Sequence, residues 1–113
     1  MNALEEIHSC LKDILPVATG IFPAPAPDAY AVLVPLSDTF DLHADNSPGV
    51  DVQEVRISLF AKGNYLAFRN RIQRALLDRD FVISGRLYNG YEQDTGYHHY
   101  VMDAAKHYKF KEE

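Results

Sequence analysis

The stretch from Val52 to Ala61 constrains the fold most. Successive side chains of a β-strand point to opposite faces, so strict alternation of apolar and other residues predicts a strand with one strongly apolar face. A slip of one residue would turn the apolar set toward solvent, so the strand register is well specified. The apolar set is Val55, Ile57, Leu59 and Ala61, and the set between is Glu54, Arg56, Ser58 and Phe60.

Two segments have helical periodicity instead. The first covers residues 3–15, with Asn2 as N-cap and Pro16 as the stop. The second covers residues 65–78 and follows the N-cap candidate Asn64. Each carries apolar side chains at three- and four-residue spacing, which predicts one core-facing stripe per helix.

Further strands are expected before the second helix. We predict strands at residues 20–22 and 30–36, joined by a stiff, extended crossover through the proline-rich segment 23–27. Pro35 cannot donate to a ladder, so the second strand should end there or lie at an edge. A long hairpin with an acidic tip is then expected from residues 40–44 and 50–61.

Two more strands are expected after the second helix. The first covers residues 81–87 and is closed by a turn at Tyr88–Tyr91, because Asn89-Gly90 is a strong hairpin signal. The second is the aromatic run from Gly96 to Phe110. The predicted element order in the chain is therefore α-β-β-β-α-β-β.

These elements predict one domain over residues 1–113. It is an α+β two-layer sandwich in which a mainly antiparallel sheet of four or five strands buries one face under both helices. The other face is left to solvent or to a partner. We place on it amphipathic side chains of the kind enriched in protein interfaces, namely Ser58, Arg86, Tyr88, Tyr97 and His99.

Charge and cysteine content narrow the function classes. A net charge of −5, from 16 acidic and 11 basic residues, argues against a nucleic-acid-binding face. Arg69, Arg71 and Arg74 lie near Asp78 and Asp80 and are interpreted as a solvated helix face. The single cysteine, Cys10, excludes an intrachain disulfide and suits the cytoplasm. No segment has the roughly 20 apolar residues of a membrane span, and no signal peptide is expected.

No residue pattern predicts a catalytic, metal or cofactor site. His98 and His99 are adjacent in a predicted strand and therefore point to opposite faces, so they cannot readily share a metal. The acidic residues Asp38, Asp41, Asp45 and Asp51 lack the spacing of a calcium loop. Nucleophile-elbow and phosphate-binding motifs are absent from the sequence. An enzyme using His98 or His99 as general base is kept as a minor alternative.

The helix GNYLAFRNRIQRALL and the ending YNGYEQDTGYHHYVMD point to a family. With the leading helix and the acidic hairpin, they resemble the tail-completion and tail-terminator proteins of long-tailed bacteriophages and prophages. The resemblance implies a non-enzymatic virion subunit, made in the host cytoplasm. It forms a ring, commonly a hexamer, that caps the tail tube and joins it to the head connector, with DNA passing through the lumen. No cofactor, membrane or sequence-specific nucleic acid is implied.

The resemblance also suggests where a ring contact and a lumen would lie. A ring closes through heterologous contacts between neighbouring subunits. We place these on Tyr30, Val32, Leu36, Phe40, Leu42, Arg86, Tyr88, Tyr97 and His99, and we place the acidic residues Asp38, Asp41, Asp45 and Asp51 at the lumen. The alternative is a monomeric or dimeric protein-binding module of prophage origin, whose composition would look the same.

Overall fold

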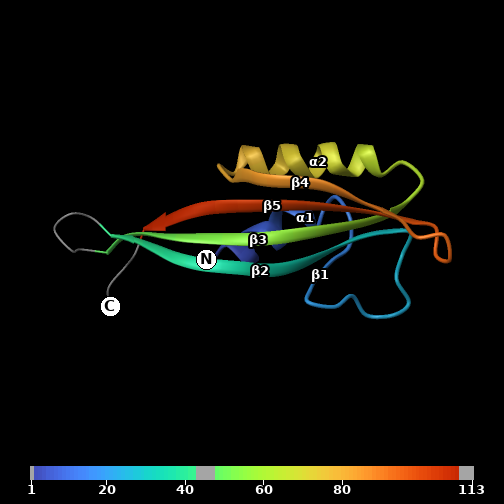
Figure 1. Cartoon of the computed structure of the whole chain (residues 1–113), viewed down its shortest axis with the longest axis horizontal. Coiled ribbons are helices and arrows are strands. Elements are labelled where there is room, and N and C mark those ends of the chain that lie inside the picture. Colours follow the sequence, from blue (N-terminus) through green and yellow to red (C-terminus); the bar gives the residue numbers. More distant parts are fainter. Residues whose placement is uncertain (1, 43–47, 110–113) are drawn as a thin grey trace.

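The computed structural model describes residues 2–42 and 48–109, and the side chains of residues 37–50 and of Lys109 fall outside that description. Five strands form one mixed sheet in the order β1-β2-β3-β5-β4. In Figure 1, α1 lies behind the strands and α2 runs alongside β4, and both helices pack into one core against the same face of the sheet, which confirms the predicted α+β two-layer sandwich. The elements are α1 (Ala3–Leu11), β1 (Val17–Thr19), β2 (Ala29–Leu42), β3 (Pro48–Lys62), α2 (Tyr65–Asp78), β4 (Val82–Tyr91) and β5 (Tyr97–Lys109).

The central strand β3 organises the core. β3 pairs antiparallel with β2 on one side and with β5 on the other. The alternate residues predicted to be apolar and buried are 0 to 3% exposed and face the helices, which confirms the alternation. They are Val55, Ile57, Leu59 and Ala61. Ile7 and Leu11 of α1, with Ile72 and Leu76 of α2, complete the same cluster. Burial of this apolar surface is the main force that holds the two layers together.

The helices agree with the sequence at three of their four ends. The Asn2 Oδ1 atom accepts a hydrogen bond from the Glu5 amide at 2.8 Å, which confirms the N-cap. Helix α2 has the predicted bounds, with Asn64 as its cap. Helix α1, however, ends at Leu11 and not at Leu15. The amides of Ile14 and Leu15 both donate to the Leu11 carbonyl, which closes a tight turn before Pro16 disfavours further helix.

The strands before α2 differ from the prediction in two ways. The first strand is Val17–Thr19 and not residues 20–22, and it pairs parallel with Ala31–Leu33. Strand β2 does not end at Pro35 but continues to Leu42, with a β-bulge between Pro35 and Ser37. Because β1 covers only three residues of β2, the strand is an edge at Pro35, as expected. The missing proline N–H therefore interrupts no ladder within the sheet.

The predicted turn at Asn89-Gly90 is wrong. Both residues lie inside β4, where a second bulge separates Tyr88 from Gly90. A type I′ turn needs positive φ at both central residues, and only Gly90 has it, at 123°. The chain instead reverses at Glu92–Gly96, where the Gly96 amide donates to the Glu92 carbonyl at 2.8 Å.

Three strands continue beyond the helices. β3 pairs with β5 as far as Val50 opposite Lys109, and with β2 as far as Pro48 opposite Leu42. Figure 1 shows this extension as a narrow ribbon at the end of the molecule away from the β4–β5 turn. The principal-axis extents of 55 × 23 × 23 Å reflect it. Within the described residues, neither helix has the length and apolar character needed to cross a membrane.

Candidate functional site

In the described part of the chain, the sheet face turned away from the helices carries no second layer, and we call it the open face. Its side chains come from β2, β3, β5 and β4, and strand register arranges them in three rows across the sheet. The aromatic row is Tyr30, Phe60 and His99. The aliphatic row is Val32, Ser58, Val101 and Leu87. The third row is Val34, Arg56, Asp103 and Gly85.

The aromatic row is packed by stacking. The Tyr30 ring stacks on Phe60 at 4.9 Å between centroids, and Phe60 stacks on His99 at 4.3 Å. Tyr97 meets the Tyr30 ring edge-on at 5.5 Å. Burial raises the pKa of the Tyr30 hydroxyl above its ordinary value, so Tyr30 stays neutral at physiological pH.

The proline-rich connector between β1 and β2 covers one end of this row. The Tyr97 hydroxyl donates to the Pro27 carbonyl at 2.6 Å, and the Phe22 ring lies 4.7 Å from Tyr30. Tyr97 is only 8% exposed as a result. It lies on the open face as predicted, but most of its ring is already covered by the chain itself.

His99 has one satisfied and one unsatisfied ring nitrogen. The Asn89 amide nitrogen lies 3.0 Å from Nδ1, and because that amide nitrogen only donates, Nδ1 accepts and Nε2 carries the proton. Nε2 is buried and has no hydrogen-bond partner in the described part of the chain. Burial lowers the pKa of the imidazole, although the charge of Glu92 opposes this, so His99 is held neutral.

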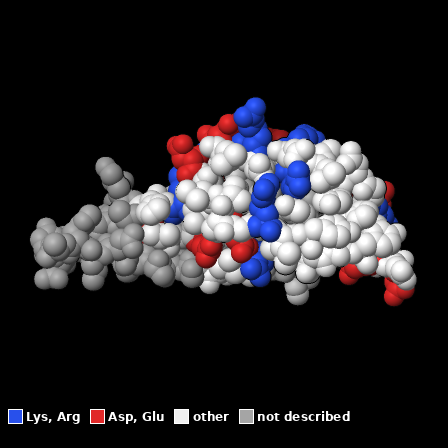
Figure 2. Space-filling view, turned by 45° about the horizontal axis from the view of Figure 1, so that its top comes forward, with Lys and Arg blue, Asp and Glu red and all other residues white. Residues whose placement is uncertain are grey.

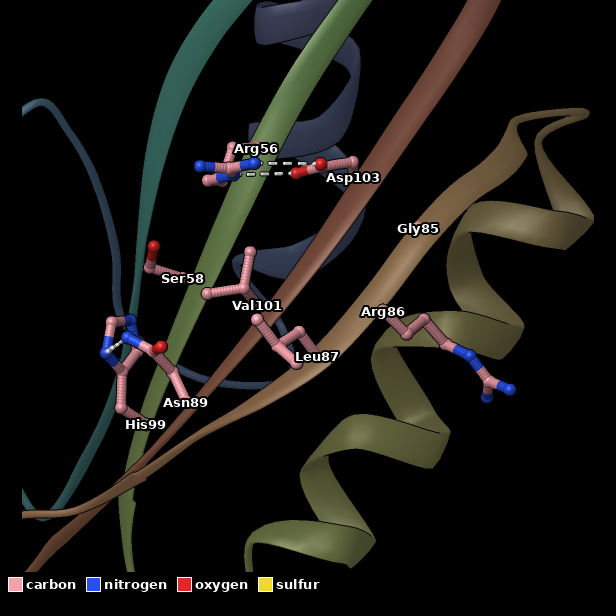
Figure 3. A pocket seen from close by; sticks show the side chains of 9 residues that line it. All are labelled: Arg56, Ser58, Gly85, Arg86, Leu87, Asn89, His99, Val101 and Asp103. Atoms are coloured by element: carbon pink, nitrogen blue, oxygen red, sulfur yellow. Dashed lines mark hydrogen bonds and ion pairs between the residues drawn. The ribbon is translucent and has the colours of Figure 1, made fainter.

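The third row contains an ion pair. Arg56 Nε and Nη2 donate to the two carboxylate oxygens of Asp103, at 2.8 and 3.0 Å (Figure 3). Hydrogen bonding to Asp103, with the charge of that carboxylate, raises the pKa of the guanidinium further. This bidentate geometry fixes both side chains flat across β3 and β5. A partner covering the row would therefore meet a neutralised pair and not two separate charges.

A shallow depression lies between the aromatic row and the ion pair. Its volume is about 440 Å³, and Ser58, Gly85, Leu87, Val101 and Asn89 are among its lining residues. A second depression of about 400 Å³ continues across β2 to Ile21 and Phe22 and shares Ser58 with the first. The depression forms because Ser58 has a small side chain and Gly85 has none. Figure 3 shows Leu87 and Val101 projecting over this face.

Arg86 and Tyr88 do not lie on the open face, contrary to the prediction. Arg86 Nη1 donates to Gln73 Oε1 of α2 at 2.8 Å, and Figure 3 shows its side chain turned toward that helix. The Tyr88 hydroxyl lies 2.8 Å from His98 Nδ1, and its ring packs on Tyr65 of α2. The cause is the bulge at Ser84, which inserts one residue into β4 and reverses the alternation beyond it.

The two adjacent histidines lie on opposite sides of the sheet, as predicted. His99 stacks on Phe60 on the open face, whereas His98 packs on Tyr65 on the helix side. No group of three or more potential metal ligands occurs among residues 2–42 and 48–109. The open face has aliphatic and aromatic side chains in the middle and a neutralised charge pair beside them.

The other predicted contact residues lie along β2 and β3. Tyr30 and Val32 belong to the open face, and Leu36 is 40% exposed at the β2 bulge. Asp51 accepts a hydrogen bond from Gln53 Nε2 at 2.8 Å. Asp38, Phe40, Asp41 and Leu42 belong to β2, but their side chains fall outside the description, as does Asp45 entirely. The predicted acidic lumen therefore stays a prediction.

Sequence reasoning missed Asp103, Asn89, Leu87 and Val101 as parts of this surface. The alternating pattern identified Arg56 as a polar strand position, but its partner Asp103 lies 47 residues away in the sequence. Pairing between them depends on the register of β3 against β5, which no local pattern encodes. The β4 bulge places Leu87 on the open face, opposite Val101.

No family model and no curated protein matches this sequence. The likeness to bacteriophage tail-completion proteins therefore rests on the sequence pattern alone, and the function drawn from it is a proposal.

Proposed function

We propose that this chain is a structural subunit of a bacteriophage tail that assembles into a ring, completes the tail tube and joins it to the head connector. The observation that carries the proposal is the open face. A two-layer sandwich leaves one sheet face without a cover, and here that face has an apolar centre and not the polar surface typical of a solvated sheet.

The chemistry of the open face suits a protein partner. The aliphatic row supplies apolar area, the aromatic row is rigid because its rings already stack, and the Arg56–Asp103 pair is already neutralised. Little side-chain freedom would be lost on contact, which reduces the entropic cost of association. The tail tube protein and the head connector are the partners that the resemblance suggests for such a surface.

The test is assembly, measured directly. Size-exclusion chromatography with light scattering is run over a wide concentration range, with and without purified tail tubes, followed by electron microscopy. We expect ring-shaped species, or tubes capped at one end, when the wild-type chain is present. Free monomer alone does not contradict this, because the subunit can require its partner for ring closure.

Two variants make the test specific to the open face. Val101→Asp places a charge in the middle of the aliphatic row and should abolish tube capping. Gln93→Asp adds the same charge at the exposed β4–β5 turn and should leave capping unchanged. A strict monomer that ignores tubes would instead support the binding-module alternative.

A further inference from the structure

Exposed apolar side chains gather at the two opposite edges of the sheet. Of the nine large apolar side chains exposed in the described part of the chain, six flank the β4 edge and three flank the β1–β2 edge. Val82 and Leu87 are 58% and 61% exposed on β4, and Ile21 is 83% exposed after β1. The β4 set is Leu66, Leu77, Val82, Leu87, Tyr88 and Tyr91. The β1–β2 set is Ile21, Val34 and Leu36.

Helix α2 contributes to the first of these edges. Leu66 and Leu77 lie on the same helical stripe as Gln73, which contacts Arg86 of β4. A groove of about 470 Å³ runs between this stripe and β4, lined by Leu77, Val82 and Ile83 among others. The β4 edge therefore has apolar groups on both sides of the strand, whereas a purely solvated edge would be charged.

The helices give the two edges opposite charge. α1 packs against β1, β2 and β3, and α2 packs against β3, β5 and β4, so each helix lies toward one edge. α1 contains Glu5 and Glu6 and no lysine or arginine; Glu6 is paired with Lys106 of β5, whereas Glu5 lines a depression with Thr19 of β1. α2 contains Arg69, Arg71 and Arg74 against the single acid Asp78. Figure 2, in which the top of Figure 1 comes forward, shows Lys and Arg side chains in the middle of the molecule and Asp and Glu side chains beside them.

Strand direction allows the two edges to meet. β2, β3, β5 and β4 are antiparallel in succession, so β4 runs opposite to β2. When a second copy is placed edge to edge with its helices on the same side, its β2 lies antiparallel to β4 of the first. The acidic α1 of one copy then comes beside the basic α2 of the other, with apolar groups between the strands.

We propose that the ring closes through this heterologous contact, with the β4–α2 edge of one subunit against the β1–β2–α1 edge of the next. The assignment rests on the proposed function and names the contact that it requires. A contact between two different patches repeats around a ring, whereas a single self-complementary patch would stop at a two-fold dimer. It also leaves the open face available for the tail tube.

The backbone edges limit how this contact forms. The Ala31 amide donates to Pro16 and the Leu33 carbonyl accepts from Gly20, so alternate residues of β2 turn outward, and Pro35 follows in that series. Pro35 offers no N–H there, and β4 carries two bulges. A continuous row of backbone hydrogen bonds between the two subunits is therefore interrupted on both edges, and side-chain contacts stabilise the interface. Two free subunits then bind weakly, and closure of the ring supplies the remaining stability.

Variants that disable one edge at a time test the assignment. Leu66→Asp/Leu77→Asp disables the β4 edge without touching the open face, and Ile21→Asp/Leu36→Asp disables the β1–β2 edge; all four positions are exposed. At high concentration, chemical cross-linking of the wild type should give a ladder of species up to a closed ring. Each variant alone should give monomer only. An equimolar mixture should stop at a dimer, because each variant keeps one intact edge.

The control is Gln93→Asp, which adds a charge at an exposed position of the β4–β5 turn and should cross-link like the wild type. Circular dichroism and thermal unfolding establish that every variant is folded. The assignment would be overturned, and the proposed function left intact, if either edge variant alone formed rings. The same holds if each variant alone capped tail tubes. A wild-type chain that never exceeds monomer, with or without tubes, would overturn both.

Discussion

At the scale of single residues, Glu6 anchors α1 to the end of β5. Its two carboxylate oxygens accept hydrogen bonds from Lys106 Nζ and from the Tyr108 hydroxyl, each at 2.8 Å. Lys106 also donates to the Arg79 carbonyl that follows α2. Lys106 of β5 therefore joins α1 to the C-terminal end of α2, and burial with the Glu6 contact raises the pKa of Tyr108.

Glu6→Gln should lower the free energy of unfolding at pH 7 by roughly 1–2 kcal/mol, because a partly buried charge-assisted hydrogen bond is lost. Burial alone would raise the pKa of Glu6, but Lys106 and Tyr108 outweigh it and lower the value below 4.5. The stabilisation is therefore present above pH 4.5 and is lost as pH falls through the lowered pKa. Urea unfolding of both proteins between pH 7 and 3 measures this. A constant difference across that range would contradict it.

His99 should make stability sensitive to mild acid. Its pKa is lowered below 6.5 in the folded protein, so the unfolded chain binds a proton first and stability falls as pH drops below 6.5. His99→Phe keeps the stack on Phe60 and removes the unpartnered Nε2–H. We expect the variant to lose less stability than the wild type between pH 7.5 and 5.5. Equal losses in urea titrations would show that His99 is not responsible.

At the scale of elements, the sequence predicted what depends on local periodicity and capping. The bounds of α2 and the apolar face of β3 are correct because each repeats over several residues, and Asn2 and Asn64 are correct as caps. The failures occur where one residue changes the outcome. The bulge at Ser84 reverses the alternation of side chains, so Arg86 and Tyr88 lie on the helix side and Leu87 lies on the open face. Bulges depend on pairing with a distant strand, so no local pattern predicts them.

Pro35→Ala should allow the exposed edge of β2 to pair with a strand of another copy. The substitution returns an N–H that faces outward, where β1 no longer covers the strand. Loss of the proline constraint on the unfolded chain should cost about 0.4–1 kcal/mol of stability. Light scattering against concentration should then show a larger average mass than for the wild type. Unchanged mass at matched concentrations would mean that Pro35 does not limit association.

At the scale of the whole molecule, the described part is long, with helices at one end and a three-stranded ribbon at the other. The helices cover one face of the sheet and leave two free edges and one free face. The proposed ring would use all three, with each copy contacting one neighbour at each edge and the tail tube at the open face. Ring formation and capping of tail tubes are the corresponding measurements.

The unequal charge of α1 and α2 has a consequence for kinetics. Glu5 of α1 toward one edge and the three arginines of α2 toward the other give the chain an electric dipole across its strands. In the proposed ring assembly, this dipole would turn two copies toward edge-to-edge alignment before their surfaces touch and would raise the rate of productive encounters. Counterions screen this torque beyond about 8–10 Å at ordinary ionic strength. Added salt should therefore slow the growth of rings more than it weakens rings that have closed.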